Sequence, residues 1–263
     1  MGVALGVDAF FVEPARLVVN RQELRLPNWP AELAGVRVAF LSDLHVGSPH
    51  WPLSRLHELV QSVNAERPNL ILLGGDYLIN DVWFGNHVDA EPIAAELGQL
   101  RAPLGVFAVL GNHDWWNDGP RVRAALEAHG VGVLDDEVRR LHFNGRDLCL
   151  LGVRDETERL RSARKELELA LPDMPLLVLV HEPDLFPFLD ERATLTLAGH
   201  THGGQVDLPL LGRRVVPSRF GARYAAGHII ENGRHLFVTS GVGTSIIPVR
   251  FRVPPEIALL TLR

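Results

Sequence analysis

Residues 195–205 read LTLAGHTHGGQ, an apolar run that ends in a glycine and two histidines. The apolar part predicts a buried strand, because a short run of this kind bounded by turn residues has the length of a strand rather than of a helix. Four further segments combine such a run, rich in Val, Leu and Ile, with side chains that can bind a metal. They are VRVAFLSDLH (36–45), LILLGGD (70–76), VFAVLGNHD (106–114) and LLVLVH (176–181).

Apolar residues at three- and four-residue intervals lie between these runs and predict helices. The first pattern stops at Pro68, the second stops before Pro103, and the third begins at Pro120, a favoured first helical position, and ends near Gly130. Alternating strands and helices favour an α/β fold. The predicted helices cover residues 53–63, 93–100, 120–130 and 160–169, and further strands are expected at 148–151, 236–239 and 257–262.

The composition excludes some classes of partner. The 263 residues include 32 acidic and 26 basic side chains, a net charge of −6, so no global positive field exists to hold nucleic acid or anionic lipid. We therefore expect no specific nucleic-acid partner. Neither a repeat nor a long Gly/Ser linker marks a boundary, which predicts a single domain over residues 1–263 with its motif-bearing core at about 34–245. The only cysteine, Cys149, is predicted to be a buried, inert thiol.

The candidate metal ligands all follow predicted strands. In open α/β sheets ligands bind outside the carboxyl ends of the strands, so five separate segments are expected to converge. Glycines directly before Asp76, Asn112 and His200 would let the chain turn sharply and approach a metal closely. A single such motif is more often a surface pair, but an ordered set of five would require five coincidences. The ligand set is Asp43, His45, Asp76, Asn112, His181, His200 and His202.

The chemistry of this set indicates the kind of metal. Carboxylates, an amide oxygen and imidazoles suit Mn, Fe or Zn rather than Ca or thiolate-bound structural zinc. Two such cations can clamp a phosphoryl group and acidify a water near neutral pH. His113 is left over beside the site as a candidate proton donor. The seven histidines outside the motifs are interpreted as structural.

The order of these motifs resembles the calcineurin-like metallophosphoesterases. The resemblance implies two packed mixed β-sheets flanked by helices, in a four-layer α/β/β/α arrangement. It also implies that Asp76 bridges two metals, and that His113 stabilises charge on the substrate or protonates the leaving oxygen, with Asp114 as its orienting partner. By the same resemblance, one metal takes Asp43, His45, Asp76 and His202, and the other takes Asp76, Asn112, His181 and His200.

Segments near both ends of the chain are similar to the bacterial YaeI/YkuE-type branch of this family. They are FVEP (11–14), GHTHGGQ (199–205), GVGTS (241–245) and PEI (255–257). In that branch a membrane helix or export signal often precedes the segment that matches residues 11–14. The apolar stretch over residues 3–12 is too short for either and is interrupted by Asp8, which leaves a soluble member, an internal start and a shortened chain as alternatives. We expect a cytoplasmic protein or one peripheral to the bacterial membrane, with a membrane surface as a partner in the second case.

Two further groups of residues have alternative interpretations. Four arginines crowd one stretch directly after a ligand-bearing loop, and they are either substrate-phosphate contacts or part of a solvated loop. Trp115 and Trp116 either form a wall of the substrate pocket or pack into the core. Arg250 is predicted to lie at the edge of a strand. The four arginines are Arg213, Arg214, Arg219 and Arg223.

Together these features predict a binuclear metal-dependent phosphohydrolase. Metal-bound hydroxide would attack a phosphodiester or a related phosphate ester in line, with two divalent metal ions per chain, Mn favoured and Fe or Zn as alternatives. The expected partner is a small phosphorylated substrate, which can be lipid-linked. One alternative is pyrophosphate hydrolysis of a nucleotide-sugar lipid such as UDP-diacylglucosamine, which an apolar groove beside the metals would favour. The other is a non-catalytic metal-binding module, for which missing ligands would be the signature.

Overall fold

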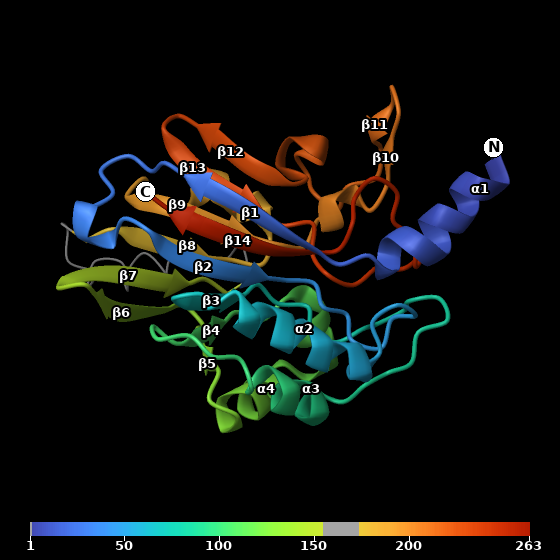
Figure 1. Cartoon of the computed structure of the whole chain (residues 1–263), viewed down its shortest axis with the longest axis horizontal. Coiled ribbons are helices and arrows are strands. Elements are labelled where there is room, and N and C mark those ends of the chain that lie inside the picture. The colour runs from blue at the N-terminus through green and yellow to red at the C-terminus, as the bar shows by residue number, and fades with distance from the viewer. Residues whose placement is uncertain (1, 155–173) are drawn as a thin grey trace.

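Two six-stranded sheets lie face to face in the computed structural model, which describes residues 2–154 and 174–263 (Figure 1). The first sheet has the spatial order β1 (Val18–Leu24), β14 (Glu256–Leu262), β2 (Val36–Leu41), β3 (Leu70–Leu73), β4 (Val106–Ala108) and β5 (Gly132–Val133). The second has the order β12 (Gly227–Glu231), β13 (Arg234–Val238), β9 (Ala193–Ala198), β8 (Leu176–Leu179), β7 (Arg146–Gly152) and β6 (Glu137–Phe143). A separate hairpin consists of β10 (Asp207–Leu208) and β11 (Gly212–Arg213).

Both sheets are mixed, as predicted. Strands β2 to β5 pair in parallel, and so do β7, β8, β9 and β13, whereas β14 runs antiparallel to β2. At the edges of the second sheet, β12 and β6 pair antiparallel with their neighbours. The expected strands at 36–41 and 70–73 have the predicted bounds, while the strand expected at 106–110 ends at Ala108.

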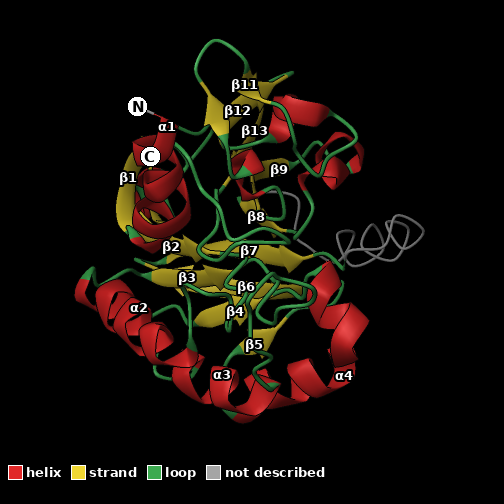
Figure 2. Ribbon diagram, turned by 90° about the vertical axis from the view of Figure 1, so that its right-hand side faces the viewer, coloured by secondary structure: helices red, strands yellow, loops and turns green. Residues whose placement is uncertain are grey.

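Three helices cover the outer face of the first sheet: α2 (Leu53–Ala65), α3 (Ala90–Leu97) and α4 (Asn112–Ala128) (Figure 2). On α2 the buried residues Leu56, Leu59, Val60 and Val63 follow helical spacing and form one apolar stripe. This stripe belongs to the same apolar cluster as Ile71 of β3. The two packed mixed sheets with flanking helices confirm the predicted fold class.

Helix α4 begins eight residues before the predicted start at Pro120. Gly111 and Asp114 cap its first turn, and Asp118 interrupts it with φ −161° and ψ 81°. The Arg121 N–H donates to the Asp118 carboxylate (3.1 Å), so a second helical segment starts there, with Pro120 in its first turn. The prediction therefore located the second segment and missed the first.

The outer face of the second sheet packs against short 3₁₀ segments, η5 (Pro183–Phe188) and η7 (Gly221–Tyr224). The helix predicted at 160–169 lies outside the described residues. Near the start of the chain, α1 (Gly2–Val7), the π-helical turn η1 (Asp8–Val12) and the 3₁₀ turn η2 (Glu13–Ala15) precede β1. The remaining 3₁₀ turns of the described residues are η3 (Ala31–Leu33) and η6 (His202–Gly204). Within the described residues, no helix has the length and apolar character needed to cross a bilayer.

The buried side chains of β7 and β8 alternate between the layer between the two sheets and the outer face of the second sheet. Leu150 and Leu177 face Phe40 and Leu72 of the opposite sheet, whereas Cys149, one position along β7, belongs to the cluster on the outer face. This alternation follows from the two-residue period of a strand. Cys149 is a buried free thiol, as predicted.

We predict that Leu177→Ala lowers the free energy of unfolding by about 2–5 kcal/mol, since it opens a cavity between the sheets at a fully buried position. Urea unfolding followed by circular dichroism measures the change. The control is Ile230→Ala, whose side chain is 59% exposed and whose loss should change stability by less than about 0.5 kcal/mol. Equal losses in both variants would contradict the assignment of the intersheet layer as core.

Candidate metal centre

The seven candidate ligands meet where strands from both sheets end. Each follows its strand directly: two residues follow β2, one follows β3, one begins α4 after β4, one follows β8 and two follow β9. Parallel strands place their carboxyl ends at one edge of a sheet, which is why segments distant in sequence converge here. In that order the residues are Asp43 and His45, Asp76, Asn112, His181, and His200 and His202, all buried or half-buried.

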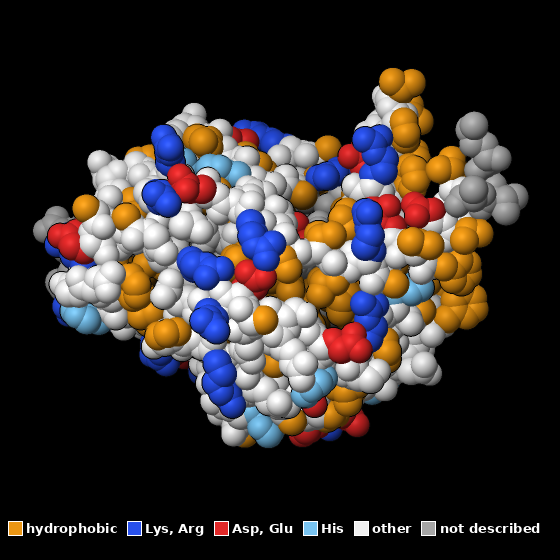
Figure 3. Space-filling view, in the orientation of Figure 1, with side chains coloured by type: hydrophobic (Ala, Val, Ile, Leu, Met, Phe, Trp, Pro, Cys, Tyr) orange, Lys and Arg blue, Asp and Glu red, His pale blue; other side chains and the backbone are white. Residues whose placement is uncertain are grey.

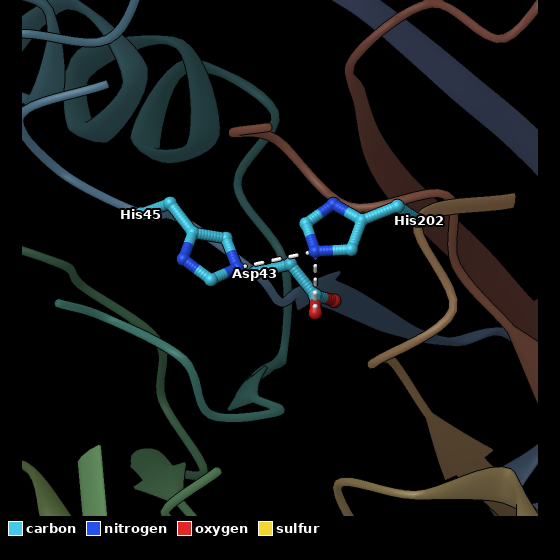
Figure 4. A group of neighbouring side chains, drawn as sticks. All are labelled: Asp43, His45 and His202. Carbon is cyan, nitrogen blue, oxygen red and sulfur yellow. Dashed lines mark hydrogen bonds and ion pairs between the residues drawn. The ribbon is translucent and has the colours of Figure 1, made fainter. Parts of the chain in front are cut away.

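Asp43, His45 and His202 form the first group (Figure 4). His45 Nε2 lies 3.1 Å from His202 Nε2, which lies 3.5 Å from Asp43 Oδ1. His45 donates its Nδ1–H to the carbonyl of Leu78 (3.2 Å), so in the neutral ring the lone pair on Nε2 points into the group. In metal sites, the ring nitrogen of a histidine that does not bind the metal usually donates a hydrogen bond of this kind, which fixes the orientation of the ring.

The second group contains Asp76, Asn112, His181 and His200. His181 donates its Nδ1–H to the carbonyl of Gly74 (2.7 Å), which leaves a lone pair on Nε2 of the neutral ring. That Nε2 lies 3.2 Å from Asp76 Oδ2, 3.1 Å from Asn112 Oδ1 and 3.2 Å from His200 Nδ1. In this tautomer of His181, the carboxylate oxygen of Asp76 and the amide oxygen of Asn112 lie against another acceptor atom, and a cation between them would remove their mutual repulsion.

One carboxylate lies between the two groups. Asp76 Oδ1 accepts the backbone N–H of His113 (2.9 Å). Asp76 Oδ2 is 3.2 Å from His181 Nε2 in one group and 3.6 Å from His45 Nε2 in the other. A single oxygen thus faces both groups.

The spacing of these atoms fits bound cations. Two ligand atoms held by one ion at about 2.1 Å lie about 3.0 Å apart at a right angle and about 3.4 Å apart at the tetrahedral angle. The separations within the two groups run from 3.1 to 3.6 Å. Burial lowers the pKa of His45 to about 3 and that of His200 to about 4, which keeps these rings in the neutral form that binds metals.

The backbone at the centre is strained. Five of the seven candidate ligand residues have a positive φ: Asp43 (54°), His45 (40°), Asp76 (56°), His200 (68°) and His202 (50°). Side chains with a Cβ rarely adopt this left-handed conformation, and such strain gathers at functional sites. A Cβ at Gly111 would overlap the Asp76 carboxylate, and one at Gly199 would overlap Ser42 and Asp43. The expected role of glycine in close approach is therefore seen at both positions.

Asp114 performs a different task from the one expected. Its carboxylate accepts the backbone N–H groups of Asp76 (2.8 Å), Tyr77 (2.9 Å), Leu78 (3.3 Å) and Gly111 (2.9 Å). Within the described residues the buried Nδ1 of His113 has no hydrogen-bond partner, so Asp114 does not orient that ring. The Asp114 carboxylate is instead occupied by these four backbone N–H groups. Asp114 holds together the loops that carry Asp76 and Asn112.

Arg250 supports the centre from behind, although the sequence predicted a strand edge for it. Its side chain is fully buried and donates to the carbonyls of Ser240 (2.8 Å), Gly243 (2.6 Å) and Val253 (3.0 Å). The N–H of Gly243 in turn donates to the carbonyl of Asp43 (2.6 Å). Burial lowers the pKa of Arg250 to about 10, so it remains charged at neutral pH. The only sign in the sequence that Arg250 could support the centre was its position between the GVGTS and PEI segments.

A cavity of about 960 Å³ opens onto the ligands. His113, His200 and His202 line it on the polar side. The Trp116 ring, 5.0 Å from the His113 ring, forms a wall, whereas Trp115 packs against the core with Arg154 3.7 Å above its ring. The lining also includes the apolar side chains of Ile79, Val82, Val215, Val216 and Ile246.

The four arginines do not converge on this cavity. Arg213 is ion-paired with Asp207 (3.8 Å), Arg219 with Asp184 (3.3 Å) and Arg223 with Glu231 (2.6 Å). Arg214 is exposed, and none of the four lines the cavity. Acidic partners from outside the arginine-rich stretch pair with three of the four arginines, and their role as contacts of the substrate phosphate stays a prediction.

Comparisons with known proteins agree with this geometry. Residues 36–204 match the sequence profile of the family described as calcineurin-like phosphoesterase. The chain is 29% identical over 262 residues to the uncharacterized metallophosphoesterase YkuE of Bacillus subtilis, covering 97% of this chain and 88% of the relative. It is 32% identical over 243 residues to the phosphodiesterase YaeI of Escherichia coli, covering 90% of this chain and 86% of the relative.

A solved structure with a similar fold is GAP50, the anchor in the inner membrane complex of Plasmodium. The TM-score is 0.51 at 13% identity, over 86% of this chain and 80% of that one, so the likeness concerns the fold alone. Fold, ligand order and sequence matches agree. The chain belongs to the calcineurin-like phosphoesterase family, and it is a metal-dependent phosphoester hydrolase.

Proposed function

We propose that the chain hydrolyses phosphodiesters or related phosphate esters with two divalent cations. Asp43, His45, Asp76 and His202 would hold one cation, and Asp76, Asn112, His181 and His200 the other. The observation that carries the proposal is the gathering of acceptor atoms around His181 Nε2 and Asp76 Oδ2. Bound cations would supply acidification of a water and neutralisation of charge on the phosphoryl oxygens. Mn²⁺ is proposed as the activating metal, although Zn²⁺ would compete for the same ligands.

His113 is proposed to act on the substrate rather than on a metal. Its half-buried ring lines the cavity beside His45 and Asp76, and its Nε2 lies 4.0 Å from Asp76 Oδ2. Its backbone N–H already holds Asp76 Oδ1. From this position the ring can give a proton or a hydrogen bond to the leaving oxygen.

The apolar part of the cavity supports a second candidate, an amphiphilic substrate such as a nucleotide-sugar lipid hydrolysed at its pyrophosphate. Ile79, Val82 and Ile246 can shield an apolar group, while the candidate ligands that line the same cavity would face the phosphate. The non-catalytic alternative would require missing ligands. All seven candidate ligands are present and near one another, which favours catalysis.

Removal of metal with a chelator should abolish hydrolysis of bis-p-nitrophenyl phosphate, because the described centre offers no other means of activating water. Re-addition of Mn²⁺ after removal of the chelator should restore the rate. Elemental analysis must accompany each rate measurement. Full activity in protein shown to be metal-free would refute the proposed function.

For His113→Ala, an alkyl phosphodiester should lose about 10²- to 10⁴-fold in rate, because its basic leaving oxygen needs a proton. A nitrophenyl ester should lose far less, since its leaving oxygen is stable without one. Metal content should equal that of the wild type. Asn80→Ala, which changes a neutral polar residue of the cavity lining, is the control and should slow both esters equally if at all. An equal slowing of both esters by His113→Ala would exclude the proton-donor role.

A further inference from the structure

Large apolar side chains are exposed at one end of the molecule. Of the fifteen large hydrophobic residues exposed in the described part of the chain, twelve lie within residues 5–12, 83–84 and 208–215 or are Ile246, and the other three are Trp116, Phe188 and Ile230. Figure 3 shows these apolar side chains at the end with the hairpin, with basic side chains among them. We define the apolar rim as the exposed hydrophobic residues of segments 5–12, 83–84 and 208–215 together with Ile246.

Backbone contacts join the segments of the apolar rim. The N–H of Trp83 donates to the carbonyl of Ile246 (2.9 Å), and the N–H of Asp207 donates to the carbonyl of Phe251 (2.9 Å). The N–H of Arg250 donates to the carbonyl of Ala9 (2.9 Å), which attaches the N-terminal helical segment. Segments far apart in sequence therefore form one continuous surface, on which α1 and the β10–β11 hairpin lie at the same end of the molecule (Figure 1).

The apolar rim continues into the cavity. Val215 and Ile246 are exposed on the rim and also line the cavity that opens onto the candidate metal ligands. An amphiphile could thus pass from an apolar phase outside the molecule to the ligands along an apolar path. Exposed apolar surface of this extent marks an interaction site.

We propose that the apolar rim docks on a phospholipid bilayer, from which the cavity takes its phosphate ester. This inference rests on the proposed function for the identity of the reacting group. The hairpin tip has the sequence LPLLGRR (208–214), in which an apolar loop is followed directly by two arginines. Apolar side chains of such a loop enter the acyl boundary, while guanidinium groups remain at the level of the lipid phosphates.

The charges and the shape of the rim favour lipid over a protein partner. Arg214 and Arg252 are exposed and make no ion pair within the described residues, so both are available to lipid phosphates. Leu210 and Phe84 project as separate points, with Phe84 85% exposed. A fluid layer accepts separate projections, whereas a protein partner would need a matching hollow for each. Because the net charge of −6 provides no long-range attraction to anionic lipid, apolar insertion must supply most of the affinity.

The test is sedimentation of the metal-loaded full chain with vesicles of three parts phosphatidylethanolamine to one part phosphatidylglycerol. The wild type should pellet with the vesicles. The double variant Leu210→Ser/Leu211→Ser should bind at least about 10-fold more weakly, since each leucine loses its apolar burial. The matched control is Phe188→Ser/Ile230→Ser, which removes exposed apolar side chains outside the rim and should bind as the wild type does.

Three results would overturn the inference. The wild type could remain in the supernatant, the hairpin variant could bind as tightly as the control, or size-exclusion chromatography could show a wild-type dimer that the hairpin variant dissociates. The last result would make a second copy of the chain the occupant of the rim. Hydrolysis of soluble bis-p-nitrophenyl phosphate by the same samples should be unchanged in both double variants. Absence of that activity in the wild type would refute the proposed function and leave the vesicle result to be judged by itself.

Discussion

The carboxylate of Asp76 determines how the two groups of metal-binding side chains are arranged. One of its oxygens is held by the backbone N–H of His113, and the other faces imidazoles from both sheets. The position of Asp76 itself depends on Asp114, whose carboxylate accepts four backbone N–H groups from the loops around it. A buried carboxylate that accepts this many hydrogen bonds holds the loops that donate them in one conformation. The sheets can vary elsewhere, but these two residues require the ends of β3 and β4 to lie close together.

The strained backbone of the candidate metal centre destabilises the folded chain, and the packing of the rest of the fold offsets this loss of stability. Left-handed backbone at ligand residues is unfavourable by about 1–3 kcal/mol per residue. The apolar layer between the sheets and the helical layer over the first sheet stabilise the strands that lead into these turns. Arg250 adds a second constraint, because its hydrogen bonds to loop carbonyls hold the segment that contacts Asp43. The strands and the hydrogen-bonded loops together hold the acceptor atoms of the candidate ligands near one another.

Sequence reasoning predicted the features whose signals are local. An apolar run followed by a ligand identifies both the strand and its functional end, as at residues 70–76, and the helical spacing of α2 predicts its buried stripe. It did not predict interactions between side chains that are distant in the sequence. Asp184 lies 35 residues before Arg219, and nothing in the arginine-rich stretch indicates that pairing. The task of Asp114 was equally hidden, because its partners are backbone groups that only the folded loops bring together.

The central proposal is that Asp76 would be a ligand shared by two cations. The most direct test is a crystal structure of the Mn²⁺-loaded chain with anomalous scattering data collected at the manganese edge. We predict two peaks, both bonded to Asp76, one also contacting Asp43, His45 and His202 and the other Asn112, His181 and His200. A single peak at full occupancy, or two peaks of which only one contacts Asp76, would contradict the account.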